Sequence, residues 1–194
     1  MNLAALSTTQ IIIIVSVAAV VVLAIVAIAI SIRKRRTEKL RTRFGSAEYT
    51  RAVTEGGSQQ KAEAALYARA ARVEKLHIRP LGAGDRTRFV DSWAKIQARF
   101  VDGPGSAVTD ADQLLTDVMS TRGYPVSDFE QRANDISVDH PLVLANYRTA
   151  HEIALRQTRG QASTEDLRQA MIHYRTLFEE LVSEPKTVQL KRAS

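Results

Sequence analysis

The sequence predicts an all-α protein, in which a single N-terminal transmembrane helix precedes a compact antiparallel helical bundle. Three observations predict it. Residues 11–32 form an uninterrupted apolar run without charge. In the rest of the chain, apolar residues recur at spacings of three and four, which is the period of an amphipathic helix. No window alternates strictly between apolar and polar residues, so no strand is expected, and short connections favour antiparallel neighbours.

The apolar run, IIIIVSVAAVVVLAIVAIAISI, has 22 residues, of which only Ser16 and Ser31 are polar. At about 1.5 Å per residue it spans the roughly 30 Å hydrocarbon core of a bilayer. A buried helix of a soluble protein would carry polar residues at every third or fourth position. A signal peptide is the other alternative, but residues 1–10 carry no basic side chain, and basic residues stand where cleavage would occur. We therefore expect a single-pass signal-anchor helix.

A basic juxtamembrane segment, residues 33–43, follows this run and contains one acid, Glu38. Its basic residues are Arg33, Lys34, Arg35, Arg36, Lys39, Arg41 and Arg43. Seven bases less one acid give +6, the net charge of the whole chain, so the remainder is neutral. Because Lys and Arg flanks stay in the cytoplasm, we expect residues 1–10 outside and the chain after the run inside. The segment should contact anionic lipid headgroups, at about 1 kcal/mol per basic residue, rather than nucleic acid.

The helical domain is expected over residues 44–183, beginning with a short piece of helix. The basic segment should remain helical to Arg43, and Gly45 should break it. A helical piece over residues 47–54 should follow, and the glycine pair that ends at Gly57 is the clearest joint in the chain.

Amphipathic helices and their caps account for the rest of the domain. Helices are expected at residues 58–76, 85–100, 106–122, 127–134, 139–159 and 163–183. The expected N-terminal caps are Asp85, Ser106, Ser127 or Asp128, Asp139, and Ser163 in a capping box with Asp166, and the C-terminal caps are Gly123 and Gly160. The apolar stripes are Ala62, Leu66, Ala70, Val73 and Leu76; Phe89, Trp93, Ile96 and Phe100; Val108, Ala111, Leu115 and Val118; Leu144, Tyr147, His151 and Ala154 or Leu155; and Leu167, Ala170, Tyr174, Leu177 and Leu181. Residues 184–194 should be disordered.

Motifs for catalysis or metal binding are weak in this chain. His151 and Glu152 begin like the zincin motif, but the second ligand position is Leu155, so the motif fails. His173 lies on another expected helix and could meet His151, with Glu152 or Asp166 nearby. This pair keeps open an alternative function as a small membrane-attached enzyme or metal-binding protein. No catalytic residue, cofactor or metal ion is expected.

Carboxylate pairs and glycine-rich segments give no better candidate. Asp110 and Asp112 are two residues apart on an expected helix, so they should point to different sides and be solvated. Gly82 and Gly84 lack the preceding strand and third glycine of a dinucleotide-binding loop.

The connection over residues 122–141 is unusually rich in charged and aromatic residues. One interpretation is a structured corner, in which glycine and aspartate caps and Arg–Asp pairs satisfy buried backbone groups. The other is a surface for a protein partner, because connections on rigid scaffolds often carry function. This possible partner surface consists of Arg122, Tyr124, Arg132 and His140.

The segment RTRFGSAEYTRAV (residues 41–53) and residues 99–182, which include RGYPVSDFEQRANDISVDHP, resemble a widespread family of uncharacterised bacterial proteins. Its members are described as hypothetical, membrane or secreted proteins with an N-terminal hydrophobic segment and a helical remainder. The resemblance implies a bacterial envelope setting. It brings no activity, cofactor or catalytic residue.

These observations together predict a membrane-tethered adaptor or scaffold without enzymatic activity. The anchor is expected in the bacterial cytoplasmic membrane, with anionic lipid around the basic segment and a protein partner bound by the helical domain. An envelope-exposed or secreted protein is the alternative if the charge rule does not hold. Nucleic acid is not an expected partner.

Overall fold

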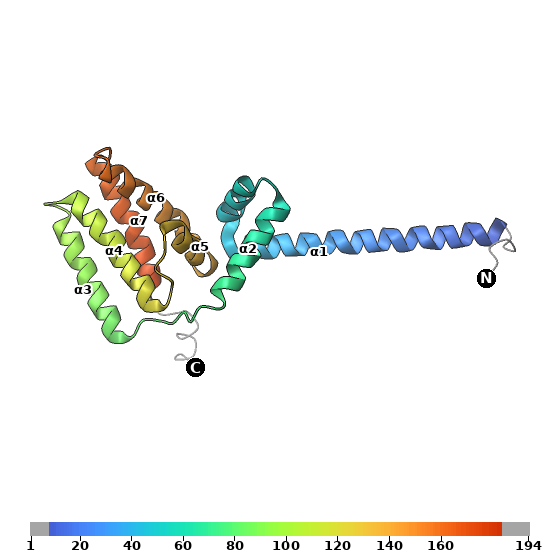
Figure 1. Ribbon diagram of the computed structural model, residues 1–194, viewed down its shortest axis with the longest axis horizontal. Helices are drawn as coiled ribbons and strands as arrows, with labels where there is room; N and C mark the ends of the chain where they lie inside the picture. Colours follow the sequence, from blue (N-terminus) through green and yellow to red (C-terminus); the bar gives the residue numbers. More distant parts are fainter. Residues whose placement is uncertain (1–7, 184–194) are drawn as a thin grey trace. The chain divides into compact units, whose positions relative to one another are not determined.

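The protein is all-α, as the sequence predicts (Figure 1). The computed structural model describes residues 8–183; residues 1–7 and the predicted C-terminal tail, residues 184–194, lie outside that range. No strand occurs among the described residues. The helices are α1 (Thr8–Gly56), α2 (Gln59–Val73), α3 (Ala83–Arg99), α4 (Pro104–Arg122), α5 (Phe129–Asp139), α6 (Pro141–Thr158) and α7 (Thr164–Val182). The chain divides into two compact units, residues 1–42 and 43–194.

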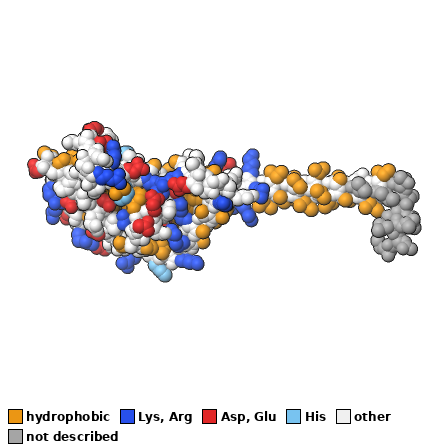
Figure 2. Space-filling model, turned by 45° about the horizontal axis from the view of Figure 1, so that its top comes forward, with side chains coloured by type: hydrophobic (Ala, Val, Ile, Leu, Met, Phe, Trp, Pro, Cys, Tyr) orange, Lys and Arg blue, Asp and Glu red, His pale blue; other side chains and the backbone are white. Residues whose placement is uncertain are grey.

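The first unit contains the apolar part of α1, which is long and apolar enough to span a membrane. Its described apolar side chains are exposed in the chain, and Figure 2 shows them along the visible face of the long helix. The Ser16 hydroxyl donates a hydrogen bond of 2.8 Å to the carbonyl of Ile12. The helix thus satisfies this polar group internally, as a lipid environment requires. The predicted helix through the basic segment is confirmed.

The second unit begins with a helical hairpin, which we define as residues 43–73. Gly45 interrupts α1 with a left-handed backbone (φ 75°), so the break expected there is confirmed. Gly57, also left-handed (φ 67°), turns the chain into α2. The Ser58 side chain then accepts a hydrogen bond from the Lys61 amide and caps that helix. A left-handed backbone favours glycine, so the glycines at these two positions indicated in the sequence where the helices are interrupted.

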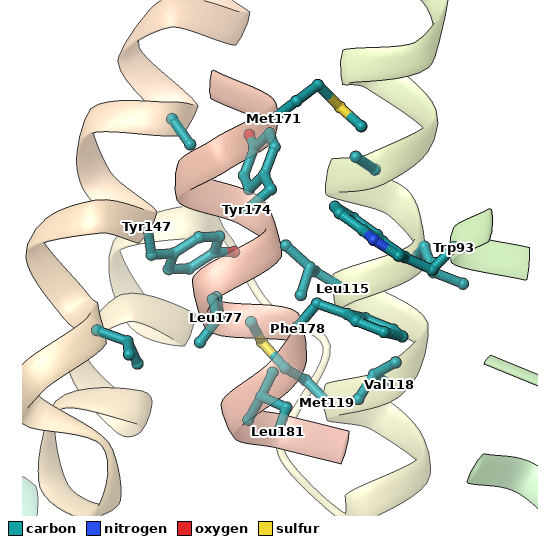
Figure 3. Close-up of a cluster of buried hydrophobic side chains, with 14 of the residues drawn as sticks. Trp93, Leu115, Val118, Met119, Tyr147, Met171, Tyr174, Leu177, Phe178 and Leu181 are labelled. Atoms are coloured by element: carbon teal, nitrogen blue, oxygen red, sulfur yellow. The ribbon is translucent and has the colours of Figure 1, made fainter. Parts of the chain in front are cut away.

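Helices α3 to α7 form the bundle, whose core lies around α7. This helix packs between α4 and α6, and Figure 3 shows its side chains pointing to both. The predicted stripe of α7, including Tyr174 and Leu177, is fully buried. In the other stripes Leu76, Phe100, Ala154 and His151 are half-buried, and Leu155 is exposed. The capping box of Ser163 is present.

Proline, rather than a side-chain cap, sets the start of two helices. We expected α4 to begin at Ser106, but it begins at Pro104, and the Ser106 hydroxyl donates to a backbone carbonyl of the first turn. We expected a helix to start at Asp139, but this residue ends α5, and α6 starts at Pro141. Proline suits the first helical position because its missing N–H would have no partner there.

The start of α3 and the end of α5 also differ from the prediction. Gly82 is the N-cap of α3, so Asp85 lies in the first turn, where it pairs with Arg88. α5 extends five residues beyond the predicted end at Asn134. Its capping by Asp128, which accepts from the Gln131 amide, is as predicted.

Candidate functional site

The corner between α4 and α5 directs its charged and aromatic side chains into the chain. Arg122 and Tyr124 are only 8% and 3% exposed. The Arg122 guanidinium donates to the carbonyl of Leu181 at 3.1 Å, and the Tyr124 hydroxyl donates to the Asp139 carboxylate at 3.0 Å. Gly123 between them has a left-handed backbone (φ 98°), and a Cβ there would lie 2.5 Å from the carbonyl oxygen of His77. The corner therefore joins α4, α7 and the connector before α3.

The other two residues of the possible partner surface are also held by internal contacts. Arg132 donates to the carbonyl of Ser127 at 2.8 Å and to the Tyr147 hydroxyl at 3.3 Å. His140 Nδ1 lies 3.0 Å from a Glu180 carboxylate oxygen. This is the arrangement expected of a structured corner, the first of the two interpretations.

His151 and His173 belong to different local environments. His173 Nδ1 lies 3.1 Å from the Asn146 side-chain oxygen. The His151 ring stacks on Phe129 with centroids 3.6 Å apart, and its Nδ1 lies 3.7 Å from the Asp112 carboxylate. Among the described residues, no three potential metal-binding side chains gather in one place.

Asp112 is half-buried under this stack, so the prediction that it is solvated was wrong. Its carboxylate accepts a hydrogen bond of 2.9 Å from the Tyr174 hydroxyl. Burial alone would raise the pKa of Asp112, but the His151 ring and the Tyr174 hydroxyl outweigh burial and lower it. Burial, together with the charge of Asp112, raises the pKa of Tyr147 to about 12. Asp112 is thus a half-buried carboxylate that accepts a hydrogen bond from Tyr174 and lies beside the His151 ring.

The hairpin meets the bundle through a group of charged and polar side chains, which we call the polar junction. Its members are Glu48, Arg51, Arg69, Arg72, Glu130, Asp135, Ser137 and Arg148. Asp135 and Ser137 on α5 are completely buried. Arg72 of α2 pairs with Asp135, and Arg69 donates to the Ser137 hydroxyl at 3.1 Å. Buried charges are tolerated where they are paired and hydrogen-bonded in this way.

Arg148 of α6 completes the polar junction on its other side. Its guanidinium lies 2.8 Å from Glu130 and 3.8 Å from Glu48. Arg51 of the hairpin approaches the same Glu130 carboxylate at 3.7 Å. Four arginines and three carboxylates therefore alternate between the hairpin and the bundle. Arg43, a member of the predicted membrane-surface cluster, also belongs to the hairpin, and its guanidinium lies 3.1 Å from Glu74, the residue that follows α2.

A cavity of about 350 Å³ opens beside the polar junction. It is lined by Arg51, Asp128, Phe129, Glu130, Arg148, His151, Glu152 and Leu155. Both arginines already contact Glu130, and none of the lining residues carries a hydroxyl, thiol or amine nucleophile. The charge of the two arginines in this cavity is therefore already balanced by a carboxylate.

No family model, curated protein or solved structure matches this chain. The resemblance to a bacterial envelope family therefore stays a prediction from the sequence.

Proposed function

We propose that the protein is an adaptor without enzymatic activity, which α1 anchors in the bacterial cytoplasmic membrane. In this proposal the second unit of the chain binds a protein partner. The observation that carries this proposal is the continuity of α1. The helix continues without a break from the apolar run to Thr42, and the second unit begins at the next residue. Residues 33–42, between the apolar run and the second unit, form about 15 Å of helix. The proposed anchor would therefore confine the second unit near the bilayer surface.

Such confinement is useful to a binding protein rather than to an enzyme with a diffusing substrate. A short tether raises the effective concentration of a membrane-bound partner to about the millimolar range. The polar junction supports the same role, because it fastens the hairpin that follows the tether to the bundle. A partner bound by the bundle would therefore be held at the membrane rather than at the end of a loose linker.

The proposed orientation places the N-terminus outside and the second unit in the cytoplasm. The support for this orientation is the distribution of basic side chains: residues 33–43, after the apolar run, carry seven, and residues 1–10, before it, carry none. Six of the seven basic residues lie in the first unit, on the exposed helix after the apolar run. We propose that they contact anionic headgroups. Alkaline phosphatase fused after Ser194 should be inactive in this orientation and active in the opposite one.

The tether is tested with three forms of the protein: the full chain, residues 43–194 alone, and residues 43–194 on an unrelated membrane helix of the same orientation. Each form is expressed in a strain that lacks the gene and is compared for rescue and for recovered partners. We expect the full chain and the exchanged anchor to rescue and to recover the same partner, and the untethered unit to do neither. Full rescue by the untethered unit would refute the proposal and favour an enzyme acting on a diffusing substrate.

A further inference from the structure

Helices α3 and α7 run antiparallel, and the floor between them is formed by two aromatic rings. Trp93 of α3 stacks on Phe178 of α7 with ring centroids 4.8 Å apart and planes 14° from parallel (Figure 3). At one end, Arg86 donates to the carbonyl of Val182 at 3.1 Å. The two helices are thus linked through side chains, while each packs its backbone closely against α4.

Above this floor lies a groove made of two adjoining hollows, of about 400 and 170 Å³, which share Gln97 and Arg175. Its lining includes Val90, Trp93 and Gln97 of α3 and Ile172, Arg175 and Phe178 of α7. Val90 and Ile172 on its walls are 46% and 44% exposed. An apolar floor with exposed aliphatic walls is a surface that a partner can cover.

The length of the groove matches one short helix. Its lining on α3 extends from Arg86 to Phe100, which is about 21 Å of helix. An amphipathic helix of about 14 residues has the same length and would present apolar residues at i, i+3, i+4 and i+7 to the floor. Recognition of this kind needs a preformed trough between two helices, which α3 and α7 provide.

The charge of the rim indicates which helix would fit. The lining contains three arginines and one acid, Glu179. Arg168 and Arg175 form ion pairs with acids on their own helix, and all of these side chains are more than half exposed. Exposed pairs of this type contribute little to stability, so an incoming carboxylate can replace the existing one. The groove therefore favours a ligand that is apolar on one face and acidic along its edges.

We infer that the groove between α3 and α7 binds an amphipathic helix of a partner protein, with acidic residues flanking its apolar stripe. The inference rests on the proposed adaptor function and names the partner's chemistry. It is independent of the tether, because binding in the groove needs only α3 and α7. Failure at the groove would leave the tether experiment unchanged, and failure of the tether would leave binding in the groove measurable.

Trp93 provides the readout, because it is the only tryptophan in the chain and lies on the floor of the groove. The full chain in lipid nanodiscs is titrated with a tryptophan-free helical peptide of about 14 residues, with leucines on one face and glutamates beside them. A matched peptide carries lysines in place of the glutamates. We expect a saturable change in Trp93 fluorescence with the acidic peptide, and binding of the basic peptide weaker by roughly tenfold or more.

Three variants connect the signal to the groove. Val90→Asp places a carboxylate on the apolar wall and should weaken binding of the acidic peptide by roughly tenfold or more. Val101→Asp is the matched control, since Val101 is 86% exposed and lies outside the groove. It should bind like the unaltered chain. Arg175→Glu should reverse the preference between the two peptides.

Three outcomes would overturn the inference. The first is absence of binding by both peptides, and the second is equal binding by the unaltered chain and Val90→Asp. The third is a concentration-dependent dimer of the full chain that Val90→Asp abolishes and Val101→Asp does not. That result would assign the groove to a second copy of this protein.

Discussion

Glu48 and Arg69 form an ion pair inside the hairpin, with Oε1 and Nη1 2.5 Å apart and side chains only 6% and 14% exposed. Removing one partner of a buried pair leaves the other charge without compensation, which costs about 3–5 kcal/mol. We therefore expect Arg69→Ala to lower the free energy of unfolding of residues 43–194 by roughly 3 kcal/mol. Urea denaturation followed by circular dichroism measures it. Arg175→Ala, which breaks an exposed pair, should cost less than about 1 kcal/mol. Equal effects of the two substitutions would show that the Glu48–Arg69 pair is solvated.

Residues 43–194 should fold without the anchor, because they form one compact unit with its own core. We expect this fragment to be soluble, strongly helical and cooperative in its unfolding. Circular dichroism during a urea titration tests all three properties. Aggregation of the fragment, or a broad transition without a baseline, would show that the part of α1 before residue 43 contributes to its folding.

Trp93→Ala should lower the free energy of unfolding by roughly 3–5 kcal/mol, because it removes a large side chain that stacks on Phe178. Leu155→Ala is the control. Leu155 was one of two choices for the inward face of α6 but is exposed, so its loss should change stability by about 0.5 kcal/mol or less. A cost below about 1 kcal/mol for Trp93→Ala would place its ring in solvent rather than against Phe178.

Gly123→Ala should destabilise the corner for two reasons. The left-handed backbone costs a non-glycine residue roughly 1–2 kcal/mol, and the new Cβ would lie 2.5 Å from the carbonyl oxygen of His77. Gly84→Ala is the matched substitution, since Gly84 lies in α3 and a Cβ there meets nothing within 4 Å. It should stabilise by up to about 1 kcal/mol. Opposite signs in the two urea titrations are the expected result, and destabilisation by both would contradict it.

Alkaline pH should unfold the second unit, because burial raises the pKa of Tyr124, Tyr147 and Tyr174. An unfolded tyrosine ionises near pH 10, whereas Tyr147 in the fold holds its proton to about 12. Unfolding in this interval releases protons, so stability is complete below about pH 10 and falls as the pH rises towards 12. Tyrosinate absorbance should increase over the same pH interval in which helix is lost. Tyr147→Phe should reduce the absorbance change of this transition by one tyrosinate. Ionisation of these tyrosines before any loss of helix would contradict the prediction.

The fold was predictable wherever a local signal determined it. The break at Gly45, the capping box of Ser163 and the left-handed cap at Gly123 each depend on residues within one turn of helix. Stripes at helical spacing likewise identified most of the buried face of α7. The predicted helix start was wrong where a proline and a possible side-chain cap stand a few residues apart, as at Pro141 and Asp139.

The polar junction was missed because its pairs join distant parts of the sequence. Arg69 and Ser137 are 68 residues apart, and Arg72 and Asp135 are 63 apart. An arginine beside an apolar stripe looks the same whether it faces water or a buried carboxylate. The composition did carry one usable sign. The domain's charges balance, so internal pairing was available to its arginines, but nothing in the pattern identified the partners.

The separation of these charged partners also matters while the chain is being made. At roughly 5–20 residues per second, Arg72 is synthesised about 3–13 s before Asp135. During that interval Arg69 and Arg72 have no bundle to bind, and under the proposed anchoring they remain hydrated close to the bilayer. Under the proposed anchoring, an apolar docking face in the same position would partition into the bilayer, whereas a cationic one stays at the headgroups or in water. A charged junction thus keeps the nascent hairpin available for the carboxylate that arrives last.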